Sequence, residues 1–176
     1  MSLPNIPFEF EVHPISRQWE LGSFDCGVPA LNEYLQKFAR QNHDRNIGKT
    51  FVALEKGSTR RVLGFYTAVA SEIDLHAIPH PHSKYLPRYP VPVVRIGRLA
   101  VDKHHQGQRI GEGLLLDALG RAKRLSLDVG IYAVAVDAKD EKAAQFYLKY
   151  GFVPLTNNPR ALFLPIGTIK ILFSGR

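Results

Sequence analysis

The segment that most constrains the fold lies near the middle of the chain, where a strand pattern meets a helix pattern. It reads Arg98-Leu-Ala-Val-Asp-Lys-His-His-Gln-Gly-Gln-Arg-Ile-Gly-Glu-Gly-Leu-Leu. We expect the strand to end near Val101 and the helix to begin near Ile110. Free N–H groups at a helix start bind anions, and glycines allow the backbone to approach a phosphate closely. The segment therefore indicates either a phosphate-binding turn or an ordinary strand-to-helix connection. It matches neither the Walker A loop nor the dinucleotide fingerprint.

The other residues alternate between strand and helix patterns, which predicts a mixed α/β fold. Apolar spacing predicts helices from Pro29 to about Gln41, over 110–127 and around 143–150, the last ended by Gly151 as a left-handed cap. The buried face of the middle helix is expected to hold Leu115, Ala118, Leu119, Ala122 and Leu125. Strands are predicted over 8–13, 50–55, 62–71, 93–101, 131–136, 152–155 and 161–166.

Two connections and the domain count complete this prediction. A turn around Gly57-Ser58 joins the second and third strands, and the proline-rich residues 75–92 form a loop. The sequence contains neither a repeat nor a low-complexity segment, so we expect residues 1–176 to form a single domain.

The charge balance favours either an anionic partner or a well-solvated basic surface. The 176 residues carry a formal net charge of +7, and a nucleic acid is the sharper interpretation. The N-terminus lacks a secretory signal pattern, and no apolar run approaches the ~20 residues that cross a bilayer. The one cysteine, Cys26, cannot form a disulfide within the chain. We therefore expect a cytoplasmic protein that does not associate with a membrane.

Three motifs resemble those of the GCN5-related N-acetyltransferase (GNAT) family. Gln106-Gly-Gln-Arg-Ile-Gly111 resembles its acetyl-CoA loop, Arg98-Leu-Ala-Val101 its central strand, and Ala144-Gln-Phe-Tyr-Leu-Lys-Tyr-Gly-Phe152 its late helix and following turn. The resemblance implies the GNAT fold, in which a central, mostly antiparallel mixed sheet splays at the acetyl-CoA site and is flanked by helices. It implies an N-acetyltransferase with acetyl-CoA as donor. The cofactor-binding residues that it implies are Leu99, Ala100, Val101, Gln106, Gly107, Gln108, Arg109, Ile110, Gly111 and Glu112.

One position departs from the family pattern. Arg109 stands where a glycine is usual. If the backbone there has positive φ, arginine is sterically unfavourable. Its guanidinium could instead add a contact to phosphate.

A narrower resemblance is to the TacT-type toxins of bacterial toxin–antitoxin pairs. The segments that carry it are Phe24-Asp-Cys-Gly27, Leu31-Asn-Glu-Tyr-Leu35, Ala39-Arg-Gln-Asn42, Lys49-Thr-Phe-Val-Ala53, Gly64-Phe-Tyr66, Tyr89-Pro-Val-Pro-Val93, Gly97-Arg-Leu-Ala-Val-Asp-Lys103 and Val153-Pro-Leu155. It implies an enzyme that acetylates the α-amine of aminoacyl-tRNA and so blocks translation. It also implies a homodimer and a ribbon-helix-helix antitoxin. The net charge fits a tRNA substrate independently.

Tyr147 is the candidate general acid, because the tyrosine of this Phe-Tyr pair in the GNAT pattern lies beside the coenzyme A sulfur. A phenol of pKa ~10 is protonated at neutral pH and can donate to a thiolate. The alternative is a core tyrosine on an amphipathic helix. An α-amine, with a pKa of ~7.7–8.0, is partly neutral at cellular pH, so a strong general base is dispensable.

Two groups of basic residues are, as a set, candidates for binding tRNA phosphates, although each one alone is more typical of a solvated surface. They are Lys37, Arg40, Arg45 and Lys49 around the first helix, and Arg95 and Arg98 on the central strand. Strand alternation places Arg95 and Arg98 on opposite faces. We expect no metal site at His76, His80 and His82, and no nucleophilic role for Cys26.

Two other functions remain open at this point. One is acetylation of a small amine or a protein N-terminus, which would use the same cofactor site without the basic residues. The other is a non-catalytic module that binds acyl-CoA or nucleic acid. Arg109 favours that module, and Tyr147 argues against it.

Overall fold

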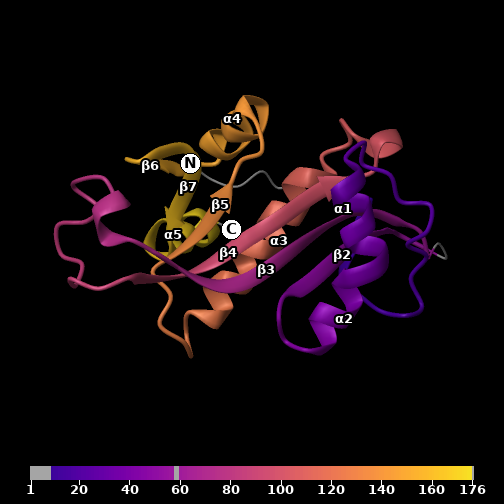
Figure 1. Ribbon diagram of the computed structural model, residues 1–176, viewed down its shortest axis with the longest axis horizontal. Helices are drawn as coiled ribbons and strands as arrows, with labels where there is room; N and C mark the ends of the chain where they lie inside the picture. The colour runs from indigo at the N-terminus through magenta and orange to yellow at the C-terminus, as the bar shows by residue number, and fades with distance from the viewer. Residues whose placement is uncertain (1–8, 58–59, 176) are drawn as a thin grey trace. The chain divides into compact units, whose positions relative to one another are not determined.

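The structure, a computed structural model, describes residues 9–57 and 60–175. Its strands are β1 (Phe10–Pro14), β2 (Lys49–Glu55), β3 (Val62–Ile73), β4 (Val91–Val101), β5 (Ala133–Asp137), β6 (Val153–Leu155) and β7 (Asn158–Pro165). Its α-helices are α1 (Pro29–Glu33), α2 (Ala39–Asp44), α3 (Ile110–Leu125), α4 (Glu141–Lys149) and α5 (Ile166–Ser174) (Figure 1). Phe8 of the first predicted strand and Ser58 of the predicted turn lie outside the described residues.

The strands form a mixed sheet in the order β1-β2-β3-β4-β5-β7-β6. Neighbours β1–β2, β2–β3, β5–β7 and β6–β7 are antiparallel, whereas β4 and β5 are parallel. The register of β4 with β5 covers only Val93–Ile96, although β4 has 11 residues. The predicted mixed α/β fold, with its mostly antiparallel sheet, is confirmed.

The chain forms two compact units, and β3, β4 and α3 each contribute to both. The described part of the first, here called the N-terminal unit, consists of residues 9–57, 60–69 and 97–118. The second, here called the C-terminal unit, consists of residues 70–96 and 119–175.

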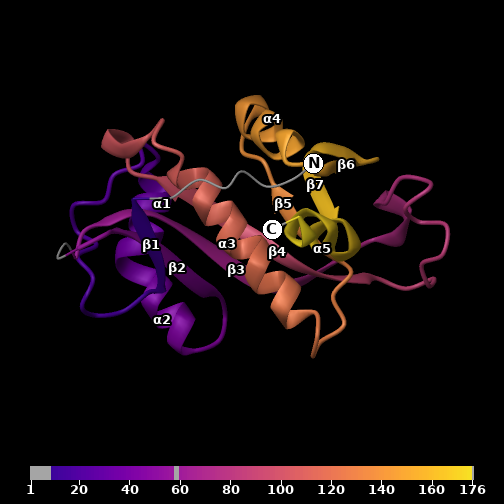
Figure 2. The same cartoon turned by 180° about the vertical axis from the view of Figure 1, so that it is seen from behind.

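In the N-terminal unit, helices cover both faces of the strands, as Figures 1 and 2 show for α2 and α3. On one face a buried cluster joins the strands to the segment 29–44; its members include Tyr34, Leu35, Ala39, Val52, Leu54 and Phe65. On the other face, a Cβ placed on Gly64 would lie 3.0 Å from Leu114 Cδ1. There the Tyr66 hydroxyl also donates to Asp117 Oδ2 at 2.6 Å. Successive residues of β3 point to opposite faces of the sheet, so Phe65 packs against the segment 29–44, whereas Gly64 and Tyr66 face α3.

The first predicted helix is present but interrupted by a π-helical turn. Helical backbone runs from Pro29, which suits the first turn, to Asp44. Between α1 and α2, residues 34–38 are π-helical, and the N–H of Ala39 donates to the carbonyl of Tyr34. Such widened turns occur frequently at functional sites. A π-helical turn contains one residue more than an α-helical turn, and the apolar spacing of this segment does not indicate that insertion.

In the C-terminal unit, α4 and α5 pack against β7. The core of this unit includes Ile73, Val91, Val93, Ala133, Ala135 and Phe163. Asp140 caps the start of α4 by accepting from the N–H of Ala143 at 2.8 Å. Gly151 ends that helix with φ 89°, so the predicted left-handed cap is confirmed.

Two expectations about this unit were wrong or incomplete. Leu125, which was expected on the buried face of the middle helix, is 45% exposed. It is the last residue of α3, where the helix is no longer covered by the core. Helix α5, whose residues follow β7 directly, is not among the predicted helices. Its buried residues Ile166, Ile169 and Leu172 recur at helical spacing, with exposed Thr168 and Lys170 between them, so the signal was present in the sequence. The proline-rich loop is confirmed, with one 3₁₀ turn at Leu75–Ala77.

Candidate active site

The turn after β4, in the N-terminal unit, is organised around a buried carboxylate. Asp102 is fully buried and caps a 3₁₀ turn at Lys103–His105. It accepts hydrogen bonds from the N–H of His104 at 2.9 Å, the N–H of Asp25 at 3.1 Å and His105 Nδ1 at 3.3 Å. Burial alone would raise the pKa of Asp102, but these hydrogen bonds hold it below its ordinary value. An ionised Asp102 therefore fixes the path of the turn.

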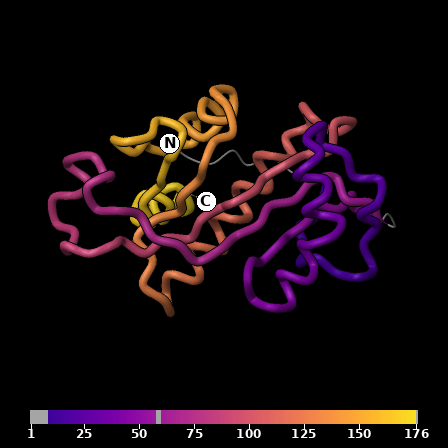
Figure 3. Tube along the Cα trace, viewed as in Figure 1, coloured from indigo at the N-terminus to yellow at the C-terminus, as the bar shows by residue number. Residues whose placement is uncertain are grey.

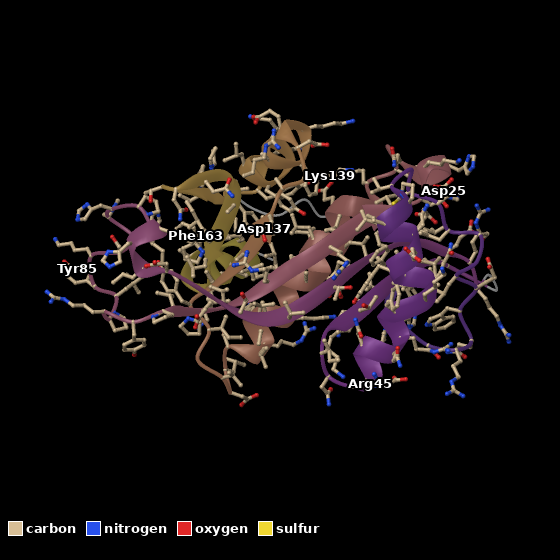
Figure 4. The ribbon with its side chains drawn as sticks, viewed as in Figure 1. Asp25, Arg45, Tyr85, Asp137, Lys139 and Phe163 are labelled. Atoms are coloured by element: carbon tan, nitrogen blue, oxygen red, sulfur yellow. The ribbon has the colours of Figure 1, made fainter. Side chains whose placement is uncertain are left out.

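A second acidic residue ties the turn to the loop before α1. Asp25 forms an ion pair with Lys103 at 2.7 Å and accepts from the N–H of Gly27 and the amide of Asn32, each at 2.9 Å (Figure 4). The N–H of Lys103 donates back to the Asp25 carbonyl at 2.8 Å. Lys103 and these donors hold the pKa of Asp25 well below its usual range.

Asp25, Asn32 and Asp102 are not among the candidate functional residues predicted from the sequence. The hydrogen bond from Asp25 to Asp102 spans 77 residues, and local spacing carries no signal at that separation. Only their place inside the segments that resemble the toxin family marked them.

The turn itself supplies the backbone geometry that an anion site needs. Gly107 has φ 79° and Arg109 has φ 62°, and α3 begins at the next residue. Arg109 therefore has the positive φ that a glycine adopts without steric cost, and the steric penalty expected for an arginine at this position applies. The first N–H groups of a 16-residue helix, from Ile110 onward, have no intrahelical partner and carry the positive end of the dipole.

The guanidinium of Arg109 is engaged with a neighbouring acid. Its Nε and Nη2 donate to the two oxygens of Glu112 at 2.8 and 2.7 Å. Glu112 is buried, and it sits in the first turn of α3, where its negative charge would oppose an incoming phosphate. Arg109 neutralises that charge.

The end of β4 directs two backbone donors away from β3. The N–H of Asp102 donates to the Leu63 carbonyl of β3 at 2.8 Å. Because successive N–H groups along a strand point to opposite edges, those of Leu99 and Val101 point away from β3. This orientation fits Leu99 and Val101 as the cofactor-binding residues that the family resemblance implies.

Tyr147 lies on α4 in the C-terminal unit and is buried between Phe146 and Phe152, with ring centroids at 5.2 and 5.4 Å. Burial, followed by the negative charge of Asp137, raises the pKa of Tyr147 to about 12. The hydroxyl is therefore protonated throughout the neutral range.

Arg95, the predicted tRNA contact of the C-terminal unit, is bound to its neighbours. Its Nη1 donates to Asp137 at 2.8 Å and its Nε to Ser71 Oγ at 3.1 Å. Asp137, at the end of β5, is labelled in Figure 4. The predicted role of Arg95 stays a prediction.

The other predicted tRNA contacts gather on or beside the segment 29–44 of the N-terminal unit. Lys37, Arg40, Arg45 and Lys49 are exposed, and Figure 4 shows Arg45 at the end of α2. Lys37 pairs with Glu33 at 2.9 Å, and Lys49 donates to the His43 carbonyl at 3.0 Å. Arg98 lies 3.6 Å above the ring of Tyr34 in the π-helical turn. These five residues, which lie on the segment 29–44 or beside it, are here called the basic helix surface.

The residues that we discounted have ordinary structural environments. Cys26 packs against the buried cluster of the N-terminal unit. The His82 ring makes an edge contact with Phe163 at 5.5 Å. Among the described residues, no three metal-ligating side chains are grouped. None of the helices in the part of the chain described here is long and apolar enough to cross a membrane.

The turn after β4, with backbone donors at the start of α3 and at the end of the strand, fits an acyl-coenzyme A-dependent acetyltransferase. Residues 46–154 match the family described as the acetyltransferase (GNAT) domain. The chain belongs to the GNAT family.

The chain is similar to two toxins, one of which is known from two solved structures. The tRNA-acetylating toxin of Mycobacterium tuberculosis (strain ATCC 25618 / H37Rv) is 35% identical over 150 residues, which cover 85% of this chain and 88% of that protein. AtaT in complex with acetyl-methionyl-tRNAfMet is 34% identical, with a TM-score of 0.87 over 93% of this chain and 99% of that one. A tyrosine-to-phenylalanine mutant of AtaT, bound to acetyl-CoA and the C-terminus of the antitoxin AtaR, is 32% identical, with a TM-score of 0.81 over 94% and 99%.

Proposed function

We propose that this protein is a toxin that uses acetyl-CoA to acetylate the α-amine of aminoacyl-tRNA and thereby blocks translation. The observation that carries the proposal is the similarity to a tRNA-acetylating toxin along 85% of the chain. The basic helix surface supports it, because a small amine would not require five cations gathered at one place.

The turn and the strand end fit an acyl-coenzyme A. The N–H groups of residues 106–112 would hold the pyrophosphate, with Arg109 keeping Glu112 neutralised. Leu99, Ala100 and Val101 would hold the pantetheine arm and orient the thioester through the donors that point away from β3. When bound, acetyl-CoA supplies an activated acetyl group.

Tyr147 would provide the proton that the departing thiolate needs. A phenol with a pKa of about 12 keeps its proton over the whole physiological range. A strong general base is unnecessary, since an α-amine with a pKa of ~7.7–8.0 is partly neutral at cellular pH.

The proposal extends to partners and location. Lys37, Arg40, Arg45, Lys49, Arg95 and Arg98 would contact tRNA phosphates. An antitoxin of the ribbon-helix-helix class would neutralise the toxin, which would act as a homodimer of single GNAT domains. Aminoacyl-tRNA is a cytoplasmic substrate, so we place the protein in the cytoplasm.

The decisive experiment is the transfer of labelled acetyl from acetyl-CoA to a pool of charged tRNAs, with deacylated tRNA as the control. We expect label on particular aminoacyl-tRNAs and none on deacylated tRNA. Intact coenzyme A binding without any labelled tRNA would refute the toxin function and leave a GNAT enzyme with another acceptor.

A further inference from the structure

The loop between β3 and β4 presents two aromatic rings to solvent at the end of the C-terminal unit. Tyr85 is 86% exposed and Tyr89 is 63% exposed. Figure 4 shows Tyr85 pointing outward from the tip of this loop. Each ring has a cationic neighbour: Lys84 Nζ lies 5.1 Å from the centre of the Tyr85 ring, and exposed Arg88 precedes Tyr89. We name these four residues the tyrosine loop surface.

The loop is tied to the unit beneath it, so the rings are presented from a fixed base. The N–H of Ser83 donates to the Pro79 carbonyl, and that of Leu86 donates to the Ser83 carbonyl. Leu86 packs against the core of the unit, and the Tyr132 hydroxyl donates to the His82 carbonyl at 3.4 Å. Figure 3 shows the loop projecting beyond the strands from which it starts. Large rings held exposed in this way indicate a binding surface.

The charge of the segment selects an anionic partner. No aspartate or glutamate occurs between Asp74 and Asp102, whereas four lysines and arginines do. The loop also contains His76, His80 and His82 and has no acid of its own. Cations interleaved with exposed rings are the combination by which proteins bind single-stranded nucleic acid, with bases stacked on the rings and phosphates beside the cations.

A pocket of about 640 Å³ adjoins the surface, a volume within the range of small-molecule sites. Arg88, Tyr89 and Pro90 line it together with Glu72, Asp74, Leu75 and His76. Asp74 is partly engaged, because it accepts from the N–H of His76 at 2.9 Å. Beside Glu72 and Asp74, the pocket offers carboxylate acceptors for the amino groups of a base and would repel a phosphate placed against them. The pocket therefore suits an unpaired base rather than the backbone of a duplex.

We infer that the tyrosine loop surface binds unpaired nucleotides of RNA, stacking bases on Tyr85 and Tyr89 while Lys84 and Arg88 contact the flanking phosphates. The inference rests on the proposed function only for its natural ligand, an unpaired stretch of the tRNA substrate. It adds a contact in the C-terminal unit to those of the basic helix surface.

The test uses the full chain and a fluorescent, unstructured RNA of about twelve nucleotides, with a duplex RNA of equal length as comparison. Affinity is measured by anisotropy over a range of salt concentrations. Replacing both tyrosines, Tyr85→Ala with Tyr89→Ala, should weaken single-strand binding by roughly 5- to 150-fold per ring. The Tyr85→Phe, Tyr89→Phe pair should bind as the wild type does, because it keeps both stacking faces. Lys84→Ala with Arg88→Ala should lower the slope of log affinity against log salt by about 1.4.

A matched control comes from the same unit. Leu127 and Ile171 are 76% and 72% exposed, so Leu127→Ala with Ile171→Ala removes similarly exposed apolar groups and should leave RNA affinity unchanged. Wild-type RNA affinity in the double tyrosine-to-alanine variant would overturn the inference. So would a variant that lost only antitoxin affinity, since the loop would then be a protein-binding surface.

The same variants separate this inference from the proposed function. We expect the alanine pair to raise KM for aminoacyl-tRNA while leaving acetyl-CoA affinity unchanged. If the wild type binds single-stranded RNA through the tyrosine loop surface but transfers no acetyl group to tRNA, the proposed function is refuted and the RNA-binding inference stands. Acetyl transfer with an unchanged KM and unchanged RNA affinity in the alanine pair would refute the inference alone.

Discussion

Arg109 and Glu112 form a bidentate ion pair across the first turn of α3, with Arg109 held in the left-handed region at φ 62°. An arginine at positive φ is strained by roughly 1–3 kcal/mol, yet it neutralises a buried carboxylate beside the proposed phosphate site. Arg109 thus destabilises the backbone of the turn and at the same time neutralises Glu112, and substitutions at the two positions can separate these effects.

Arg109→Gly should remove the strain but expose the proposed phosphate to an unpaired Glu112. We expect acetyl-CoA affinity to fall about tenfold, equivalent to ~1.4 kcal/mol. Adding Glu112→Gln should restore affinity to the wild-type value or better, because the opposing charge is gone. Calorimetric titration of the three proteins checks this. Equal affinity of the single and double variants would show that charge neutralisation is not the role of Arg109.

Asp102→Asn should destabilise the protein at neutral pH. An asparagine has one oxygen and a donating amide, so it cannot satisfy all the donors that now face Asp102. We expect a loss of about 1–3 kcal/mol in the free energy of unfolding, measured with urea.

The pH dependence of that loss follows from the lowered pKa values of Asp102 and Asp25. A depressed carboxyl pKa stabilises the fold above the unfolded value of ~3.9 and ceases to do so as pH falls through the folded value. The wild type should therefore lose stability below about pH 4, and Asp102→Asn should lose less over the same range. Parallel acid-unfolding curves for the two proteins would contradict this account.

Tyr147→Phe should lower kcat by about 10²- to 10⁴-fold while changing acetyl-CoA affinity little, because only the donated proton is removed. Transfer at the wild-type rate would show that Tyr147 is not the acid. In the wild type, a pKa of about 12 means that no alkaline decline in rate from Tyr147 should appear below that pH. The rate should instead rise with pH as the acceptor amine is deprotonated.

The raised pKa of Tyr147 also has a consequence for folding. A phenol whose pKa is higher in the folded state than the unfolded value of ~10 stabilises the fold below that value. This contribution is lost as pH rises toward 12. Tyr147→Phe should therefore lose less stability than the wild type as pH rises between those values. Thermal melts across the alkaline range measure this independently of activity.

Charge reversal of the basic helix surface separates a tRNA substrate from a small amine. Lys37→Glu, Arg40→Glu and Arg45→Glu together should abolish transfer to aminoacyl-tRNA and leave transfer to a small-amine acceptor within about twofold. Reversal of exposed Lys56 and Lys170 is the control and should have little effect. Equal loss with both acceptors would point to a folding defect rather than to tRNA binding.

Sequence reasoning was most successful where one local pattern decides the structure. The apolar run of β5, the cap at Gly151 and the turn at Gly107 each depend on neighbours within a few residues. It did not predict the hydrogen bond of Asp25 to Asp102, which depends on two distant segments meeting. It also gave no signal for the partner of Arg109, because both a phosphate and Glu112 satisfy a guanidinium.

The close approach of β3 to the start of α3 gives the last prediction. A Cβ on Gly64 would lie 2.9 Å from the Ala100 carbonyl oxygen and 3.0 Å from Leu114 Cδ1. Gly64→Ala should therefore push the end of β4 and the start of α3 away from β3, at a cost of about 1–3 kcal/mol in stability. Acetyl-CoA affinity should fall with it, because these two elements frame the turn. Gly97→Ala, also on a strand of this unit, is the control: its Cβ meets no atom within 4 Å, so stability should be retained. A Gly64→Ala protein as stable as Gly97→Ala would mean that the packing of α3 on β3 is loose enough to admit a methyl group, and that the turn is held chiefly by Asp25 and Asp102.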